Sequence, residues 1–243
     1  MEVLGIDIGG SGIKGTIVNI KTGEFLEDRY RIDTPQPATP EKIAKGVKEI
    51  TSHFKWKGNI GCGFPAVVQN GVIKTASNID KSCIGINANE LFSTATKCRV
   101  SVFNDADAAG FAELTFSDVK SIIGLTIFLT IGTGIGSAFF KDGLLIPNSE
   151  LGHIYMKNGL VGEKYCSDAI RKEKDLDWET WSKRFDEYLT YLEKLFYPDL
   201  FIVGGGASKK IDKFQPFLTI RTPLQPSKLL NNAGIIGAAL LTK

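Results

Sequence analysis

The chain has 243 residues, of which 43% are hydrophobic and 23% are charged. This composition is typical of globular proteins, and the length allows one large domain or two of ordinary size. The net charge of +2 comes without a long basic run, which argues against a dedicated nucleic-acid-binding protein. No apolar run approaches the roughly 20 residues that a membrane-spanning helix needs.

The sequence opens directly on a strand pattern, so we expect no secretory signal. The cysteines are scattered and include no C-x-x-C pair; they are Cys62, Cys83, Cys98 and Cys166. This usage predicts reduced thiols in a cytoplasmic protein.

The first part of the chain predicts several strands and two helices. Strands are expected at 2–8, 13–20, 24–32, 59–64 and 99–103, with a hairpin turn at Asn70-Gly71. A helix is expected to begin at Pro40 with Thr39 as its cap, and a short second helix at 90–96. The last of these strands runs into the segment NDADAAGFAEL.

A G-x-G-x-x-G pattern lies at Gly10, Gly12 and Gly15, within GIDIGGSGIKGTIVNI. In a dinucleotide-binding unit this pattern opens a helix, but here a β-branched run follows and predicts a second strand. The stretch therefore predicts a strand, a glycine turn and a strand, which argues against an NAD-dependent oxidoreductase. A Walker loop is also absent.

The second half repeats this pattern in SIIGLTIFLTIGTGIGSAFF. The repeat indicates two similarly built α/β halves, although glycine-rich hairpins also recur by chance. A helix at 177–196 is expected to stop before Pro198, and a buried strand at 200–203 follows. The chain closes on NAGIIGAALL, a helix of small residues.

Three glycine-rich turns follow apolar strands and suggest a phosphate-binding site, because glycine lets backbone amides approach an anion closely. The candidate donor-binding residues are Asp7, Gly9, Gly10, Ser11, Gly12, Lys14, Gly132, Thr133, Gly134, Gly204 and Gly205. Lys14 either reaches a phosphate oxygen or is an exposed strand lysine. Asp7 either holds Mg²⁺ beside the phosphates, directly or through water, or caps the turn.

Two polar segments are candidates for chemistry on a hydroxylated substrate. Asn104 and Asp105 stand where a strand turns into a helix, so Asp105 either accepts a proton during phosphoryl transfer or caps that helix. Glu150 and His153 flank Gly152 and could clamp a polyol. No second histidine or cysteine cluster stands nearby to complete a zinc site with His153.

Together these segments resemble the ROK family of sugar kinases. The similarity rests on GIDIGGSGIKG, GFPAVV, NDADAAG, LTIGTGIGSAFF, PNSELGH and IVGGGASKK. It is strongest to the polyphosphate glucokinase subgroup, some of whose members are glucomannokinases, through TPQPATPE, DLDWETW, FQPFLTIRTP and NNAGIIGAALL.

The resemblance implies an α/β, two-lobed actin-like, hexokinase-like ATPase fold related to ribonuclease H, with sugar and phosphate donor in the interlobe cleft. We expect a small lobe of residues 1–105 plus 230–243 and a larger lobe of residues 106–229.

The resemblance also assigns roles to residues. It implies that Asp105 is the general base on the sugar 6-hydroxyl. The implied sugar-binding residues are Gly63, Pro65, Asn78, Asn104, Asp105, Glu150 and His153. The cysteine-rich zinc motif of many ROK kinases is missing, so we expect no structural zinc. That motif also supplies a sugar-contacting glutamate, for which Glu163 is a candidate replacement.

The predicted activity is transfer of a phosphoryl group to O6 of glucose, with mannose as a second candidate acceptor. Inorganic polyphosphate is the predicted donor, ATP is a second candidate, and Mg²⁺ is the expected cofactor. Basic residues that could line a polyphosphate groove, or simply face solvent, are Lys164, Arg171, Lys172, Lys174, Lys209, Lys210 and Lys213.

The sequence leaves three alternative functions. One is an ATP-only hexokinase acting on glucose, mannose or an N-acetylated hexosamine. Another is a non-catalytic sugar-sensing regulator, disfavoured because no helix-turn-helix pattern precedes the first strand. The third is the oxidoreductase considered above. A homodimer without nucleic-acid or membrane partners is expected.

Overall fold

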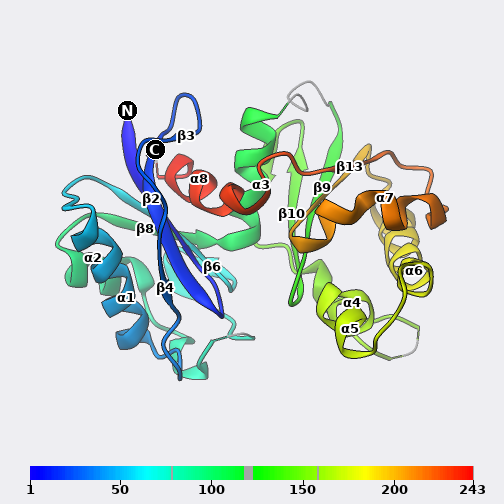
Figure 1. Ribbon diagram of the computed structural model, residues 1–243, viewed down its shortest axis with the longest axis horizontal. Coiled ribbons are helices and arrows are strands. Elements are labelled where there is room, and N and C mark those ends of the chain that lie inside the picture. Colours follow the sequence, from blue (N-terminus) through cyan, green and yellow to red (C-terminus); the bar gives the residue numbers. More distant parts are fainter. Residues whose placement is uncertain (78, 118–122, 158, 243) are drawn as a thin grey trace. The chain divides into compact units, whose positions relative to one another are not determined.

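The computed structural model describes residues 1–77, 79–117, 123–157 and 159–242 (Figure 1). The chain forms two compact units, one of Met1–Phe116 with Asn232–Lys243 and the other of Ser117–Asn231. Residues 106–116, which the sequence analysis assigned to the second lobe, cluster with the first unit. The reason is that α3 (Asp105–Phe116) packs extensively against α8 (Ala233–Leu240).

The sheet of the first unit has the strand order β3-β2-β1-β5-β8, with β4 also paired to β2. Its strands are β1 (Glu2–Ile8), β2 (Gly12–Asn19), β3 (Glu24–Phe25), β4 (Tyr30–Asp33), β5 (Ile60–Phe64) and β8 (Val100–Asn104). Strands β1, β5 and β8 are parallel, so their carboxyl ends lie at one edge of the sheet.

Helices cover this sheet on both faces. Leu4, Ile6 and Ile8 share a buried core with the apolar stripe of α1 (Pro40–His53), beside α2 (Ala88–Thr96). The alternate residue Gly5 faces α8, and a Cβ there would overlap the carbonyl of Ile235. The small residues of the last helix therefore allow unusually close packing on the sheet.

Some local predictions differ from the structure. The single strand expected at 24–32 is two strands, β3 and β4, which both pair with β2. The hairpin of β6 (Val68–Gln69) and β7 (Val72–Ile73) is confirmed, and its turn residues Asn70 and Gly71 both have positive φ. A 3₁₀ turn, η1 (Lys81–Cys83), precedes α2, whose cap is Asn87.

The sheet of the second unit has the strand order β11-β10-β9-β12-β13. Its strands are β9 (Leu125–Ile131), β10 (Ile135–Lys141), β11 (Leu144–Ile146), β12 (Leu200–Gly204) and β13 (Leu224–Pro226). Its helices are η3 (Leu151–His153), α4 (Gly162–Cys166), α5 (Asp168–Glu173), α6 (Trp178–Phe196), η4 (Gly206–Lys210), α7 (Ile211–Phe214), η5 (Gln215–Phe217) and η6 (Leu230–Asn232). Trp181, Phe185 and Phe214 pack their rings together in the core.

The two units repeat one arrangement. In each, an antiparallel hairpin (β1–β2 or β9–β10) is joined by a later parallel strand beside its first strand (β5 or β12). This arrangement agrees with the predicted repeat of an α/β half.

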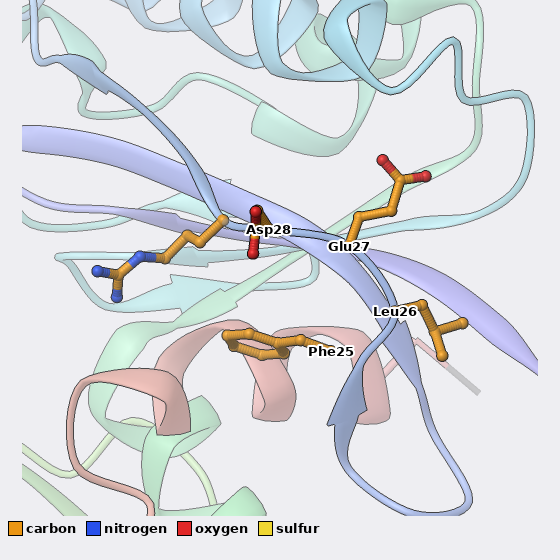
Figure 2. Close-up of a pocket in the computed structure, with 5 residues that line it drawn as sticks. Phe25, Leu26, Glu27 and Asp28 are labelled. Atoms are coloured by element: carbon orange, nitrogen blue, oxygen red, sulfur yellow. The ribbon is translucent and has the colours of Figure 1, made fainter.

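The first unit has an open pocket that none of the predicted site residues lines. It is lined by Phe25, at the end of β3, and by Leu26, Glu27, Asp28 and Arg29, which follow it (Figure 2). Across the described residues, none of the helices combines the length and the apolar character needed to cross a bilayer.

Candidate active site

The carboxyl ends of β1, β5 and β8 bring two predicted acidic residues together in the first unit. Asp7 pairs with Gly63 in the sheet, and Gly63 pairs with Phe103, two residues before Asp105. A Cβ placed on Gly63 would lie 3.7 Å from the Asp7 Oδ1 atom and 3.8 Å from the Asp105 Cβ. Gly63 thus leaves a small space that borders both acidic residues.

Asn104 caps α3 and is almost fully buried. Its amide oxygen accepts a hydrogen bond from the Asp107 amide at 2.9 Å, and its amide nitrogen donates to the Ala66 carbonyl at 3.0 Å. These bonds fix the segment after Pro65 against the start of the helix. The capping role that the sequence left open for Asp105 is therefore carried by Asn104.

Asp105 is the first residue of α3 and is partly buried. Its Oδ1 accepts a hydrogen bond from the Ala106 amide at 2.8 Å. A carboxylate held at a helix start and at a strand end is well placed to meet a substrate hydroxyl.

Asp7 and Lys14 form an ion pair, with 2.9 Å between Oδ2 and Nζ. They face each other across β1 and β2, so the sheet register itself sets the pair. Gly234 at the start of α8 packs against the same carboxylate. Asp7 and Lys14 flank the turn of Gly9, Gly10, Ser11 and Gly12, in which Gly10 and Ser11 are exposed.

The second unit brings two of the three predicted glycine turns together. The Gly132 amide donates to the Gly134 carbonyl at 3.0 Å, closing a tight turn around Thr133. Gly205 has a φ of 76° and lies so close to Ile131, at the end of β9, that a Cβ would overlap its backbone. Gly204 closes β12 and packs against Phe128 in β9.

Glu150 and His153 are hydrogen-bonded, with 2.9 Å between Oε2 and Nδ1. Burial raises the pKa of Glu150, the nearby His153 lowers it, and the negative charge of Glu163 raises it. Glu163 itself lies over Gly134, whose Cβ would come 2.5 Å from its Oε2. The structure therefore gathers Glu150, His153 and Glu163 near the Gly132–Gly134 turn.

Ser137 is a positioning residue that the sequence analysis missed. Its hydroxyl donates to the Ser149 carbonyl at 2.9 Å and accepts from the Leu151 amide at 3.0 Å. These bonds hold the segment of Glu150 against β10. In the sequence, Ser137 is a single serine within an apolar strand, and no motif spacing marks it as functional.

Some of the basic residues in the second unit have carboxylate partners. Arg171 and Lys172 both pair with Asp168, at 2.9 Å and 2.7 Å, and Lys164 lies 3.6 Å from Glu163. The guanidinium of Arg171 also lies 4.2 Å above the ring of Trp178. The predicted polyphosphate groove along these residues stays a prediction.

The residues around Gly63 fit a magnesium ion. Mg²⁺ favours one or two protein carboxylates and takes its remaining ligands from water and substrate phosphates. Asp7 supplies such a carboxylate next to the small space at Gly63. Among the described residues, no group of three or more histidine, cysteine or acidic side chains is arranged to hold a metal. Asn78, a predicted sugar ligand, lies outside the described residues.

Comparison with known proteins identifies the class to which this fold and site belong. Residues 3–176 match the ROK family model, and the chain belongs to the ROK family.

Relatives within this family include two polyphosphate glucokinases. The chain is 46% identical to the polyphosphate glucokinase of Mycobacterium tuberculosis over 97% of the chain and 89% of that protein. It is 44% identical to the polyphosphate glucokinase of Mycobacterium leprae, covering 97% of the chain and 73% of that protein.

Its structure matches the crystal structure of the inorganic polyphosphate/ATP-glucomannokinase from Arthrobacter sp. strain KM. The TM-score is 0.94 and the identity 42%, with 99% of this chain and 97% of that chain covered. The predicted family, subgroup resemblance and fold class are thereby confirmed.

Proposed function

We propose that the protein is a phosphotransferase that transfers a phosphoryl group from inorganic polyphosphate to O6 of glucose. The polyphosphate glucokinases and the glucomannokinase, which it resembles over almost its whole length, support this activity. The observation on which the proposed chemistry rests is that Asp7 and Asp105 both border Gly63. ATP as a second donor and mannose as a second acceptor follow from the named activity of the glucomannokinase.

Asp105 is the proposed general base. It accepts the proton of the sugar 6-hydroxyl as that oxygen attacks phosphorus, while the bond from phosphorus to the leaving phosphate oxygen breaks. Asn104, Gly63 and Pro65 shape the sugar site next to it, and Asn78 is a further proposed sugar ligand. The Asn104 hydrogen bonds hold Asp105 at the strand end, so the base is oriented before the sugar binds.

Glu150 and His153 are proposed to bind sugar hydroxyls, with Glu163 as the third polar group of this cluster. Glu150 offers its carboxyl oxygens, and His153, held by it, presents its other ring nitrogen. Ser137 fixes the segment that carries both residues.

The donor is proposed to bind at the glycine turns, where backbone amides face its anionic oxygens. The residues are Gly9, Gly10, Ser11, Gly12, Lys14, Gly132, Thr133, Gly134, Gly204 and Gly205. Asp7 would hold Mg²⁺, directly or through water, and the ion would supply charge neutralisation on the phosphate oxygens. Lys14, paired with Asp7, keeps this carboxylate in place.

The activity is tested by a coupled assay for glucose 6-phosphate, run in parallel with long-chain polyphosphate and with ATP. We expect product with polyphosphate and a dependence on added Mg²⁺. Product with ATP alone would identify the ATP-only alternative. The absence of product with either donor, for both glucose and mannose, would refute the proposed function.

The role of Asp105 is tested with Asp105→Asn. Loss of a general base lowers turnover by about 10²–10⁴-fold, whereas glucose binding should stay near the wild-type value. Asp177→Asn is the matched control, because Asp177 only caps α6 by accepting from the Thr180 amide at 2.7 Å. Near-normal turnover of Asp105→Asn would remove Asp105 from the mechanism.

We further propose that the protein is a homodimer. The exposed apolar residues of the second unit include Leu144 and Ile146 in β11 and Tyr191 and Leu195 in α6. Phe139, the sheet partner of Ile146, contacts Phe196 of α6, which places Ile146 on the face of the second sheet that α6 covers. Light scattering at micromolar concentration should give twice the mass of the chain, and a monomer would refute the dimer.

A cytoplasmic location is proposed as well. The four cysteines are all unpaired and buried, as expected for a protein in a reducing compartment. The test is fractionation of cells that express the protein, with reporter proteins of known location as controls. We expect the protein in the cytoplasmic fraction, and its recovery elsewhere would refute this location.

A further inference from the structure

The carbonyl groups of the Gly9–Gly12 turn are all engaged by hydrogen-bond donors. Three of these donors are side chains from a single segment, residues 31–36. The Thr34 hydroxyl donates to the Gly9 carbonyl at 2.5 Å, the Gln36 amide to the Gly10 carbonyl at 3.3 Å, and the Arg31 guanidinium to the Ser11 carbonyl at 3.0 Å. The Gly9 amide donates to the Gly12 carbonyl at 2.9 Å.

This arrangement determines where the amide groups of the turn point. In a trans peptide the carbonyl of one residue and the N–H of the next point in opposite directions. The carbonyls of Gly9, Gly10 and Ser11 are turned toward residues 31–36. The N–H groups of Gly10, Ser11 and Gly12 must therefore point away from that segment, and successive N–H groups presented in this way bind anions.

The segment that supplies the donors is itself fixed. It begins in β4, which pairs with β2 with Gly12 opposite Asp33 (Figure 1). Thr34 is buried, only 6% exposed, and its amide also donates to the Ser11 carbonyl at 3.5 Å. The Lys42 ammonium donates to the Gln36 carbonyl at 3.1 Å, tying the end of the segment to α1.

Arg31 adds a steric restraint. Its guanidinium lies directly over Gly12, where a Cβ would come 2.7 Å from Nε. Nη1 pairs with Asp33 at 2.9 Å, which holds the guanidinium flat on the turn. The turn is thus held by hydrogen bonds at three successive carbonyls and covered at its last residue.

We propose that Thr34, Gln36 and Arg31 are positioning residues that orient the Gly9–Gly12 turn for the phosphate donor, with Thr34 as the central member. This inference rests on the proposed function, because it takes the turn to be the donor site. The three residues act through the turn and not by touching the donor. Their loss should weaken donor binding and leave glucose binding intact.

The test compares Thr34→Val with Thr34→Ser. Valine has nearly the shape of threonine but cannot donate to the Gly9 carbonyl, whereas serine can. Loss of one hydrogen bond of this kind changes an equilibrium by about two- to tenfold. We expect Thr34→Val to raise the KM for polyphosphate, and the Kd for tripolyphosphate measured by calorimetry, by about five- to tenfold. The KM for glucose should stay within about twofold of the wild type, and Thr34→Ser should restore the donor constants.

Thr16→Val is the matched control. Thr16 is also buried, and its hydroxyl also donates to a carbonyl, that of Glu27, at 2.7 Å. Glu27 belongs to the segment whose side chains are drawn in Figure 2. The control loses the same type of bond, so it should lower the melting temperature without changing the donor constants.

Equal donor constants in Thr34→Val and Thr16→Val would overturn the proposal. If Thr34→Val does not fold, Gln36→Ala decides, because Gln36 is exposed and its side chain bonds the same turn. An unchanged tripolyphosphate Kd in that variant would then refute the proposal. If the wild type forms no glucose 6-phosphate with either donor, the proposed function fails, while tripolyphosphate binding still tests the positioning role.

Discussion

Gly234→Ala should lower activity while sparing stability, because the added methyl group meets the Asp7 carboxylate. A Cβ at Gly234 would lie 3.0 Å from Cγ, 3.1 Å from Oδ2 and 3.2 Å from Oδ1 of Asp7. Ordinary contacts between such atoms lie at about 3.5–4.0 Å, so the carboxylate must move by roughly 0.5 Å. Its ion pair with Lys14 resists this movement.

The expected magnitude follows from this displacement. A misplacement of about 1 Å in an active site costs about a hundredfold in rate, so roughly 0.5 Å should cost about tenfold. Alanine in a helix is favoured over glycine by about 1 kcal/mol, which offsets the crowding at Asp7. We therefore expect kcat/KM for the donor to fall about tenfold while the melting temperature stays close to that of the wild type.

The assay is the initial rate of glucose 6-phosphate formation, titrated with Mg²⁺ at saturating glucose. The Mg²⁺ concentration that gives half-maximal rate should rise in Gly234→Ala, because Asp7 is the proposed Mg²⁺ ligand. Gly46→Ala is the control. Gly46 lies in the middle of α1, and an added Cβ there would crowd the side chain of Ile13 in β2. Wild-type rates and Mg²⁺ dependence in Gly234→Ala would refute the role given to the Asp7 position.

Two further predictions concern the second unit. Ser137→Ala removes the hydroxyl that holds the Ser149 carbonyl and the Leu151 amide, so the KM for glucose should rise about fivefold with an unchanged KM for polyphosphate. An equal rise in both constants would contradict a local role. Glu150→Gln should stabilise the protein increasingly as the pH rises. The raised pKa of Glu150 means that its folded-state contribution is fully present below its ordinary pKa of 4.5 and is lost as the pH rises through the folded-state pKa. Melting temperatures of both proteins between about pH 4 and pH 7 measure this, and a constant difference would refute it.

Sequence patterns predicted strands and turns well where neighbouring residues alone determine the backbone conformation. The Asn70-Gly71 hairpin follows from two residues that adopt positive φ, and α1 follows from its apolar periodicity. Thr39 stands at the N-cap position of α1, but its side chain makes no capping hydrogen bond. The strand expected at 24–32 was wrong in its continuity. The polar run Glu27-Asp28-Arg29 interrupts the apolar alternation and lies outside both strands, and β3 and β4 pair with β2 at two separate places.

The site residues show the same division. Asp7, Asn104 and Asp105 were found because polar residues at the ends of apolar strands are unusual. Which of Asn104 and Asp105 caps α3 could not be predicted, because both residue types favour this position. The hydrogen bond from the Asp107 amide to Asn104 decides it. Ser137 and Thr34 were missed because each acts on a carbonyl that is remote in sequence.

The sequence by itself determined the glycine turns, the family resemblance and the identity of the acidic residues, because backbone freedom and charge belong to single residues and their neighbours. Only the tertiary structure decided which residues hold the turns in place, and that α8 packs its glycine against Asp7. Hydrogen bonds and close packing between segments far apart in the chain depend on strand register, and register is set by the folded sheet as a whole.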